Sequence, residues 1–71
     1  MRVQTMAELG ALVRNARERA GLTQTELAQR ARVSREWLQK VEAGRTSAEM
    51  PRVLAVLAEL DLVLDISTRE A

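Results

Sequence analysis

The stretch Gln24–Ala43, which reads QTELAQRARVSREWLQKVEA, holds two short apolar patterns on either side of a turn. The residues of the first pattern have helical spacing: Leu27, Ala28 and Ala31. Directly before them, Thr23 and Glu26 form the T-x-x-E pattern of a capping box. The first half of the stretch therefore predicts a helix of about two turns at residues 24–31.

The second half of the stretch predicts another short helix. Ser34 is a favourable N-cap residue, and Leu38 and Val41 lie three positions apart on one helical face. Gly44 stands where a left-handed residue ends a helix. We expect this helix at residues 34–43. Two short helices joined by a turn of about three residues are typical of a helix-turn-helix.

A longer helix is predicted before this stretch, at residues 6–20. Its apolar residues recur at spacings of three and four: Leu9, Leu12, Val13, Ala16 and Ala20. Thr5 and Glu8 form a second capping box at its start, and Gly21 fits the left-handed position after its end.

After the stretch, residues 51–60 are expected to form a fourth helix. Pro51 suits the first helical position, because the N–H that proline lacks would be unpaired there. The expected buried stripe consists of Val53, Leu54, Leu57 and Leu60.

Beyond this helix the apolar period changes from 3.6 to 2. Leu62, Leu64 and Ile66 alternate with other residues, which predicts a half-buried strand at residues 62–67. No other segment reads as its partner, so the simplest completion is the same strand from a second copy across a two-fold axis. A fifth helical turn with a frayed tail is the alternative.

Composition favours a small binding domain. The 71 residues suffice for one domain, 1–71, with a modest core that a dimer partner would complete. The absence of cysteine and histidine excludes disulfides and metal or nucleophile sites built on them, so no cofactor or metal is expected. The carboxylates are scattered and no Gly-rich phosphate loop is present, which argues against an enzyme. No apolar run is long enough for a membrane span or a signal peptide, so we expect a cytoplasmic protein.

Charge is divided unevenly along the chain. Residues 1–45 hold nine Lys or Arg against five Glu, a net charge of +4. Residues 46–71 hold two Arg against five acidic residues, a net charge of −3. The basic part is suited to a polyanion and the acidic part to another partner, although an uneven solvated surface would give the same count.

Taken together, the stretch resembles the helix-turn-helix of the phage repressor/Cro (XRE-type) superfamily, and the resemblance extends from Leu9 to Ile66. Within it, the chain is most similar to HipB-like antitoxins of type II toxin–antitoxin systems. The resemblance implies an all-α fold of four to five helices, lambda-repressor-like, with a short C-terminal strand that pairs across a dimer. Arg32 departs from the family pattern, which has glycine at the turn where φ is positive. Arginine is tolerated there at a cost of about 1 kcal/mol.

The resemblance places the helix at residues 34–43 in the DNA major groove. The base-contacting candidates are Ser34, Arg35, Glu36 and Lys40. Arg35 is the best candidate for specificity, since its guanidinium can donate two bonds to guanine. Glu36 can accept from cytosine or orient Arg35, and Lys40 is suited to a base or a phosphate. The alternative reading of these four residues is an ordinary polar helix face.

The backbone-contacting candidates are Thr23, Gln24, Arg32, Arg45 and Thr46. Gln24 resembles the family residue that holds a phosphate through its amide, at a helix N-terminus that favours anions. Trp37, the only aromatic residue, is expected to support the recognition helix by packing rather than by intercalation. Arg17 and Glu42 occupy family positions that form a buried structural ion pair.

The function implied is that of a sequence-specific transcriptional repressor, a homodimer that reads an inverted repeat in double-stranded operator DNA. If the antitoxin resemblance holds, the protein also binds a cognate toxin, such as a HipA-like kinase, and represses its own operon. Two alternatives remain: a standalone phage-type repressor, and a protein-interaction module that does not bind DNA.

Overall fold

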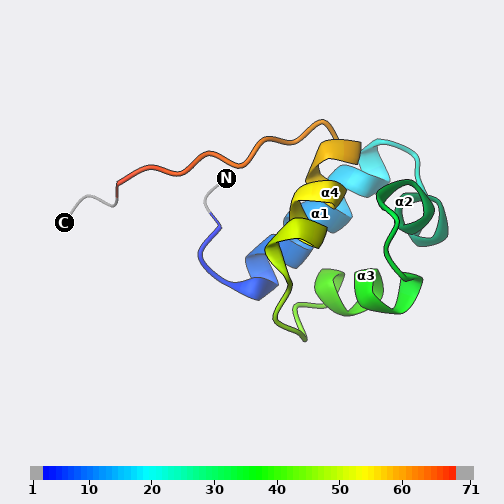
Figure 1. The fold of residues 1–71 in the computed structure, drawn as a ribbon, viewed down its shortest axis with the longest axis horizontal. Helices are drawn as coiled ribbons and strands as arrows, with labels where there is room; N and C mark the ends of the chain where they lie inside the picture. The colour runs from blue at the N-terminus through cyan, green and yellow to red at the C-terminus, as the bar shows by residue number, and fades with distance from the viewer. Residues whose placement is uncertain (1–2, 69–71) are drawn as a thin grey trace.

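The computed structural model describes residues 3–68, which contain four α-helices (Figure 1). Helix α1 spans Met6–Arg19, α2 spans Gln24–Ala31, α3 spans Arg35–Glu42 and α4 spans Met50–Glu59. Each helix agrees with its predicted range to within one residue at either end. Because α4 starts one residue earlier than expected, Pro51 occupies its second position, where the missing N–H is equally harmless.

Side-chain caps start the first three helices. The capping box predicted for Thr5 and Glu8 is only half formed, because Glu8 Oε1 accepts from the backbone N–H of Gln4, at 2.9 Å, rather than from that of Thr5. The hydroxyl oxygens of Thr5, Thr23 and Ser34 each accept a hydrogen bond from the backbone N–H three residues later. Gly21 and Gly44 follow α1 and α3 with φ of 72° and 68°, a left-handed conformation that costs glycine little. The helix ends are therefore defined by local sequence.

The core lies where α1 packs on α3 and where α2 packs on α3 and α4. Its buried apolar side chains are Val13, Leu27, Ala28, Ala31, Leu38, Val41, Val53, Val56 and Leu57. Two expected core positions are wrong: Leu54 is 46% exposed and Ala20 is exposed. In α4 the buried face runs through Val56 rather than Leu54. Ala20 is the C-cap residue, one position after the end of α1.

Gly10 marks the closest approach between α1 and α3. It is buried, and a Cβ atom there would lie 2.8 Å from the carbonyl oxygen of Glu42 and still closer to that of Val41. A side chain at this position would therefore force the two backbones apart. The absence of a side chain lets α3 lie directly on α1.

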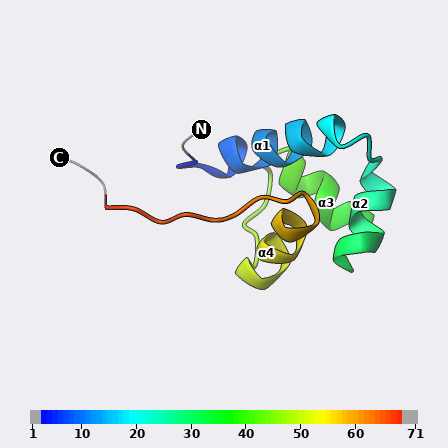
Figure 2. The same ribbon diagram turned by 90° about the horizontal axis from the view of Figure 1, so that it is seen from above.

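Residues 62–68, here called the tail, run as an extended segment away from the helices (Figures 1 and 2). The alternative of a fifth helical turn is wrong for this part of the chain. Within the described range no other segment pairs with the tail, so it is not assigned as a strand. Of the expected inward face, Leu62 is half-buried, Leu64 is 45% exposed and Ile66 is 84% exposed. Pairing of this segment across a dimer stays a prediction.

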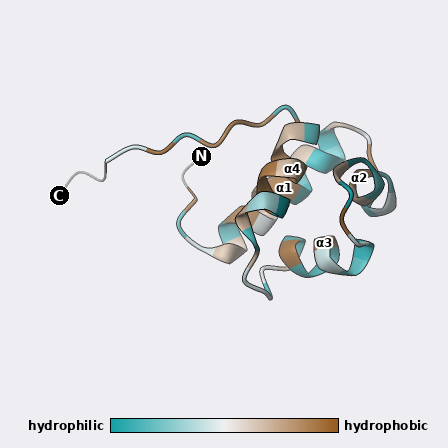
Figure 3. Cartoon of the chain, viewed as in Figure 1, coloured by the Kyte–Doolittle hydropathy of each residue, from teal (hydrophilic) through white to brown (hydrophobic). Residues whose placement is uncertain are grey.

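The hydropathy colouring in Figure 3 shows apolar residues on α4 and along the tail. No helix among residues 3–68 is both long enough and apolar enough to cross a bilayer.

Candidate nucleic-acid interface

Helix α3 lies at the edge of the helical body, with one long side free of other helices (Figure 1). Leu38 and Val41 hold it to the core, since they are 0% and 2% exposed. The predicted base-contacting residues Arg35, Glu36 and Lys40 are all exposed. Ser34 is exposed as well, and its Oγ accepts from the Trp37 N–H at 3.0 Å, which leaves the hydroxyl hydrogen available.

The N-terminus of α2 and the start of α3 share a shallow depression. Its lining residues are Arg17, Leu22, Thr23, Gln24, Thr25 and Arg35. The structure thus brings Thr23 and Gln24, both predicted backbone contacts, close to Arg35. Basic side chains and the free N–H groups of a helix start make this depression suited to an anion such as a phosphate.

The capping box fixes the start of α2. Thr23 Oγ1 accepts from the Glu26 N–H at 3.0 Å, and Glu26 Oε1 accepts from the Thr23 N–H at 2.9 Å. The backbone N–H and then the hydroxyl of Thr23 stabilise the ionised carboxylate, which lowers the pKa of Glu26. The position of Gln24, the next residue, is set by this cap.

Arg17 and Glu42 lie together in one polar network beneath the depression. Arg17 Nε donates to Glu42 Oε2 at 2.7 Å and Nη2 donates to Oε1 at 3.0 Å, while Nη1 donates to the Leu22 carbonyl at 2.8 Å. The hydrogen bond with Glu42 is the main reason that the pKa of Arg17 is raised. The Gln24 amide also donates to Glu42 Oε1, at 3.1 Å, a contact that no sequence pattern indicated.

Arg32 is exposed at the turn between α2 and α3, with φ of 58°. The expected left-handed turn is thus kept despite the missing glycine. Its N–H bonds back to the carbonyls of Ala28 and Gln29, which closes α2. The turn holds Arg32 just before the N-cap of α3.

Arg45 and Thr46 lie in the loop after α3. The Arg45 side chain is exposed, and its backbone N–H donates to the Lys40 carbonyl at 3.0 Å. Thr46 is half-buried and its hydroxyl donates to the Ser47 carbonyl at 3.0 Å, so this hydroxyl stabilises the loop. Of these two predicted backbone contacts, Arg45 exposes its charged side chain, whereas Thr46 supports the loop from within.

Trp37 is half-buried and packs against the core cluster. The ring contact that the structure gives it comes from α4: Arg52 Cζ lies 5.9 Å from the centroid of the indole ring. Arg52 is not among the residues that the sequence indicated, because it belongs to the part of the chain whose net charge is negative. The sequence feature that could have indicated Arg52 is a basic residue in the first turn of α4, next to Val53, which is buried.

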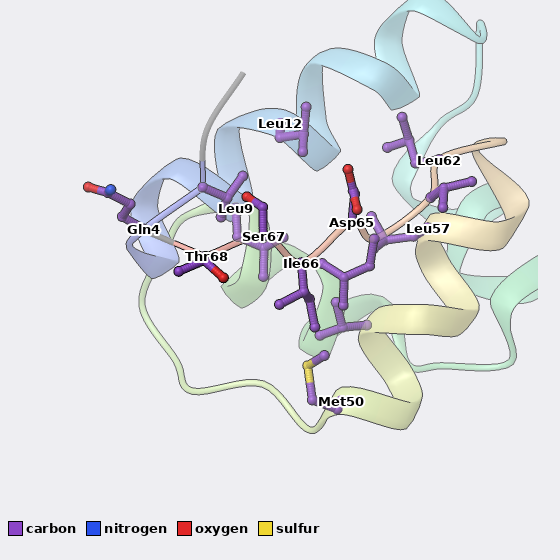
Figure 4. Close-up of a pocket in the computed structure, with 14 residues that line it drawn as sticks. Gln4, Leu9, Leu12, Met50, Leu57, Leu62, Asp65, Ile66, Ser67 and Thr68 are labelled. Carbon is purple, nitrogen blue, oxygen red and sulfur yellow. The ribbon is translucent and has the colours of Figure 1, made fainter. Parts of the chain in front are cut away.

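A second hollow, the tail groove, runs between the tail, α1 and α4 and has a volume of about 660 Å³. Figure 4 shows the tail crossing between Leu9 and Leu12 of α1 and Met50 and Leu57 of α4. The groove is lined mainly by apolar side chains, and Met50 and Ile66 are exposed in it. None of the predicted DNA contacts lines this groove.

Comparisons with known proteins agree with this arrangement. A family model described as a helix-turn-helix domain matches residues 8–69. An uncharacterized HTH-type transcriptional regulator, y4mF of Sinorhizobium fredii (strain NBRC 101917 / NGR234), is 42% identical over 65 residues, which cover 92% of this chain and 86% of that protein.

Two solved structures share the fold. A chain of a complex between a HipB variant and the O2 20mer matches with a TM-score of 0.86 and 17% identity, over 99% of this chain and 97% of that one. A chain of a structure named MDT Protein matches equally well, with a TM-score of 0.86 and 17% identity over 99% of both chains. The expected resemblance to HipB is confirmed at the level of the fold. Since the family model spans nearly the whole chain and the curated relative is 42% identical, this protein belongs to the helix-turn-helix domain family and is a homologue of an HTH-type transcriptional regulator.

Proposed function

We propose that this protein is a sequence-specific transcriptional repressor that reads DNA with α3 in the major groove. The observation that carries the proposal is the orientation of α3: its apolar residues are buried, and Arg35, Glu36 and Lys40 are all exposed on its free side. A helix that is held at the surface by one face and exposes charged residues on another can enter the groove without unfolding.

Arg35 is the principal base reader in this proposal. It lies in the first turn of α3, where recognition helices approach base edges, and its guanidinium can form two parallel bonds with guanine O6 and N7. Ser34, Glu36 and Lys40 are the further base contacts. Glu36 adds selectivity, because a carboxylate that faces DNA lowers affinity unless it accepts a bond from a base.

Backbone contacts come from the residues around the start of α3. Thr23 and Gln24 stand at the capped N-terminus of α2, where a phosphate would meet free N–H groups. Gln24 uses one amide hydrogen on Glu42, and the other remains for a phosphate oxygen. Arg32, just before α3, and Arg45, just after it, supply positive charge. Thr46 supports the loop that contains Arg45.

The repressor is proposed to act as a homodimer joined by the tail. The tail groove and the exposed apolar side chains of Val63 and Ile66 support this, because a monomer would leave them in water. Leu62, Leu64 and Ile66 of one copy would then pair with the same residues of the other. Two recognition helices related by a two-fold axis read inverted half-sites roughly 10 base pairs apart, centre to centre.

We further propose that the chain is the antitoxin of a toxin–antitoxin pair that represses its own operon. The support is the shared fold with HipB and the acidic character of residues 46–71, which suits a protein partner better than DNA. A HipA-like kinase is the toxin that this likeness suggests. A standalone repressor would lack such a partner, so a larger gene that adjoins this one distinguishes the two roles.

A protein-interaction module without DNA binding is the second candidate. The observation that favours it is the apolar tail groove, which is separate from the charged face of α3. This candidate predicts no preferred DNA sequence and little salt dependence.

The test is binding of the purified chain to DNA from directly upstream of its gene and to a scrambled duplex, at two salt concentrations. The proposal predicts tight, salt-sensitive binding to the upstream DNA that is largely lost with the scrambled one. In the Arg35→Ala variant, the preference between the two duplexes should shrink by about 10-fold or more, as expected for a lost bidentate contact.

The matched control is Arg19→Ala, which removes an exposed arginine from the last turn of α1. Its preference between the duplexes should equal that of the wild type. Equal and weak binding of the wild type to both duplexes would favour the protein-interaction module.

A further inference from the structure

The contact between Trp37 and Arg52 joins α3 to α4 at a place that the proposed DNA contacts do not use. Arg52 Cζ lies 5.9 Å from the ring centroid, within the range of a cation–π interaction. Trp37 is half-buried against the core cluster, which includes Val53, the neighbour of Arg52 in α4. The ring is therefore a fixed platform beneath a positive charge.

Within the described part of the chain, the charge of Arg52 is compensated only weakly. Its ion pair there is with Glu49, at 4.0 Å from Nε to Oε2, and the two side chains are 50% and 72% exposed. An exposed pair at that distance is weak. A guanidinium that lies over an aromatic ring keeps those of its N–H groups that do not point at the ring able to donate. Arg52 thus presents an oriented cation to solvent.

Arg52 lies on the opposite side of α3 from the depression at the start of α2. Arg35 lines that depression, and Trp37, two residues later, is rotated by about 200° around the helix axis. Trp37 instead shares its side of α3 with Lys40, three residues further on. Trp37 and Arg52 therefore lie beside the recognition helix, on the side that faces α4.

The dimensions of the DNA major groove indicate what a cation at the position of Arg52 would contact. The major groove is about 12 Å wide, and an α-helix with its side chains is about 10–12 Å across. A helix inside the groove therefore brings one phosphate wall close to each of its two sides. Thr23 and Gln24 face the wall on the α2 side. On the α4 side the proposed backbone contact is Arg45, in the loop between α3 and α4, and α4 itself can supply a further donor.

We propose that Arg52 is a DNA backbone contact, and that Trp37 is a positioning residue that holds its guanidinium toward the phosphate wall on the α4 side. This inference rests on the proposed function and adds to it a residue of α4. It also gives the only aromatic residue of the chain a specific task.

The experiment compares the salt dependence of DNA binding in matched variants of the full chain. The probes are the upstream DNA and the scrambled duplex, at salt concentrations from about 50 to 200 mM. Arg52→Ala should weaken binding to both probes by the same factor, about 5- to 10-fold near 0.1 M salt, because a phosphate contact carries no sequence information. The slope of log K against log salt should become shallower by about 0.9 for each bound recognition helix.

Arg14→Ala is the matched control. Arg14 forms a similar exposed ion pair, with Glu18 at 3.6 Å, but lies on α1. Its affinity and salt slope should equal those of the wild type. Arg52→Lys, which keeps the charge without the planar group, should keep the slope and lose only part of the affinity.

Trp37→Phe tests whether the indole ring of Trp37 positions the guanidinium of Arg52. This variant should weaken binding to both probes, and the double variant with Arg52→Ala should bind no more weakly than Arg52→Ala alone, because the ring acts through the guanidinium. Thermal melting identifies any variant that loses affinity by unfolding.

If the wild type binds the upstream DNA and Arg52→Ala behaves like Arg14→Ala, the inference is wrong while the proposed function stands. If the wild type binds neither probe, the proposed function fails and the inference with it.

Discussion

Arg17 of α1 and Glu42 at the end of α3 are joined by two hydrogen bonds, of 2.7 Å and 3.0 Å. Their side chains are only 12% and 3% exposed, so the pair is almost fully removed from water. The Gln24 amide of α2 donates to the same carboxylate. One carboxylate thus connects the three helices that form the candidate interface.

Arg17→Ala should lower the free energy of unfolding by about 3 kcal/mol, because it leaves the Glu42 carboxylate buried without its cation. Urea unfolding measures the change. Arg14→Ala, which removes an exposed ion pair, is the control and should change the free energy by less than about 1 kcal/mol. Replacing both partners, Arg17→Met with Glu42→Leu, should recover part of the loss. Equal effects of the two arginine substitutions would contradict a structural role for the pair.

Gly10→Ala should destabilise the protein by about 1–3 kcal/mol, although alanine favours helices, because the new methyl group meets the backbone of Val41 and Glu42. The measurement is again urea unfolding. Gly21→Ala is the informative comparison: nothing lies within 4 Å of its added Cβ, and its cost comes only from a φ of 72°, about 1 kcal/mol. A Gly10→Ala variant as stable as the wild type would show that α1 and α3 can separate freely.

The two glycines also show what the sequence could and could not predict. Gly21 follows a capped apolar pattern, so its left-handed conformation is a local matter that the neighbouring residues indicate. Gly10 lies inside a helix, and its role depends on which face of α1 meets α3. The apolar stripe indicated a face that includes Leu9, Leu12 and Val13, whereas the contacts of α1 with α3 also run through Gly10 and Arg17. Which surface of α1 a neighbouring helix covers depends on the tertiary structure, and local sequence patterns do not indicate it.

The candidate site also combines features that local sequence predicts with features that depend on helix packing. The caps at Thr23 and Ser34 follow from short-range patterns, and the left-handed turn at Arg32 follows from the family resemblance. Together they determine where α3 begins. The contacts of Gln24 with Glu42 and of Arg52 with Trp37 join residues 18 and 15 positions apart in the sequence. No spacing rule indicates such pairs, because they depend on how the helices pack.

Arg32→Gly should raise the free energy of unfolding by about 1 kcal/mol, since glycine adopts a φ of 58° without the strain that an L-residue meets. The same substitution should weaken DNA binding if Arg32 contacts a phosphate. Arg32→Ala separates the two effects, because it removes the charge and keeps the strained turn. Both variants should lose the same affinity in the DNA assay, and only the glycine variant should gain stability in thermal melting. Unequal affinities would assign the effect on binding to the turn rather than to the charge.

The capping box predicts a pH dependence. The folded state lowers the pKa of Glu26, so the ionised carboxylate stabilises the fold above the ordinary pKa of a glutamate, about 4.3. This contribution is lost as the pH falls through the lowered pKa. The melting temperature should therefore drop as the pH falls below about 4.3, and Glu26→Gln should show a shallower drop. A parallel pH profile in the variant would show that other carboxylates account for the whole effect.

The tail yields the last prediction. Ile66 is 84% exposed and Val63 is 88% exposed, on a segment beside an apolar groove, so dimerisation through the tail predicts that a charge at Ile66 separates the two copies. Sedimentation at micromolar concentration should give a dimer for the wild type and a monomer for Ile66→Lys. Ala58→Lys adds the same charge at an exposed position of α4 outside the groove and should stay dimeric. Ile66→Lys should also bind upstream DNA more weakly, although no proposed DNA contact is removed, because each half-site is then bound separately. A wild type that sediments as a monomer would contradict this prediction and leave the tail groove to another partner.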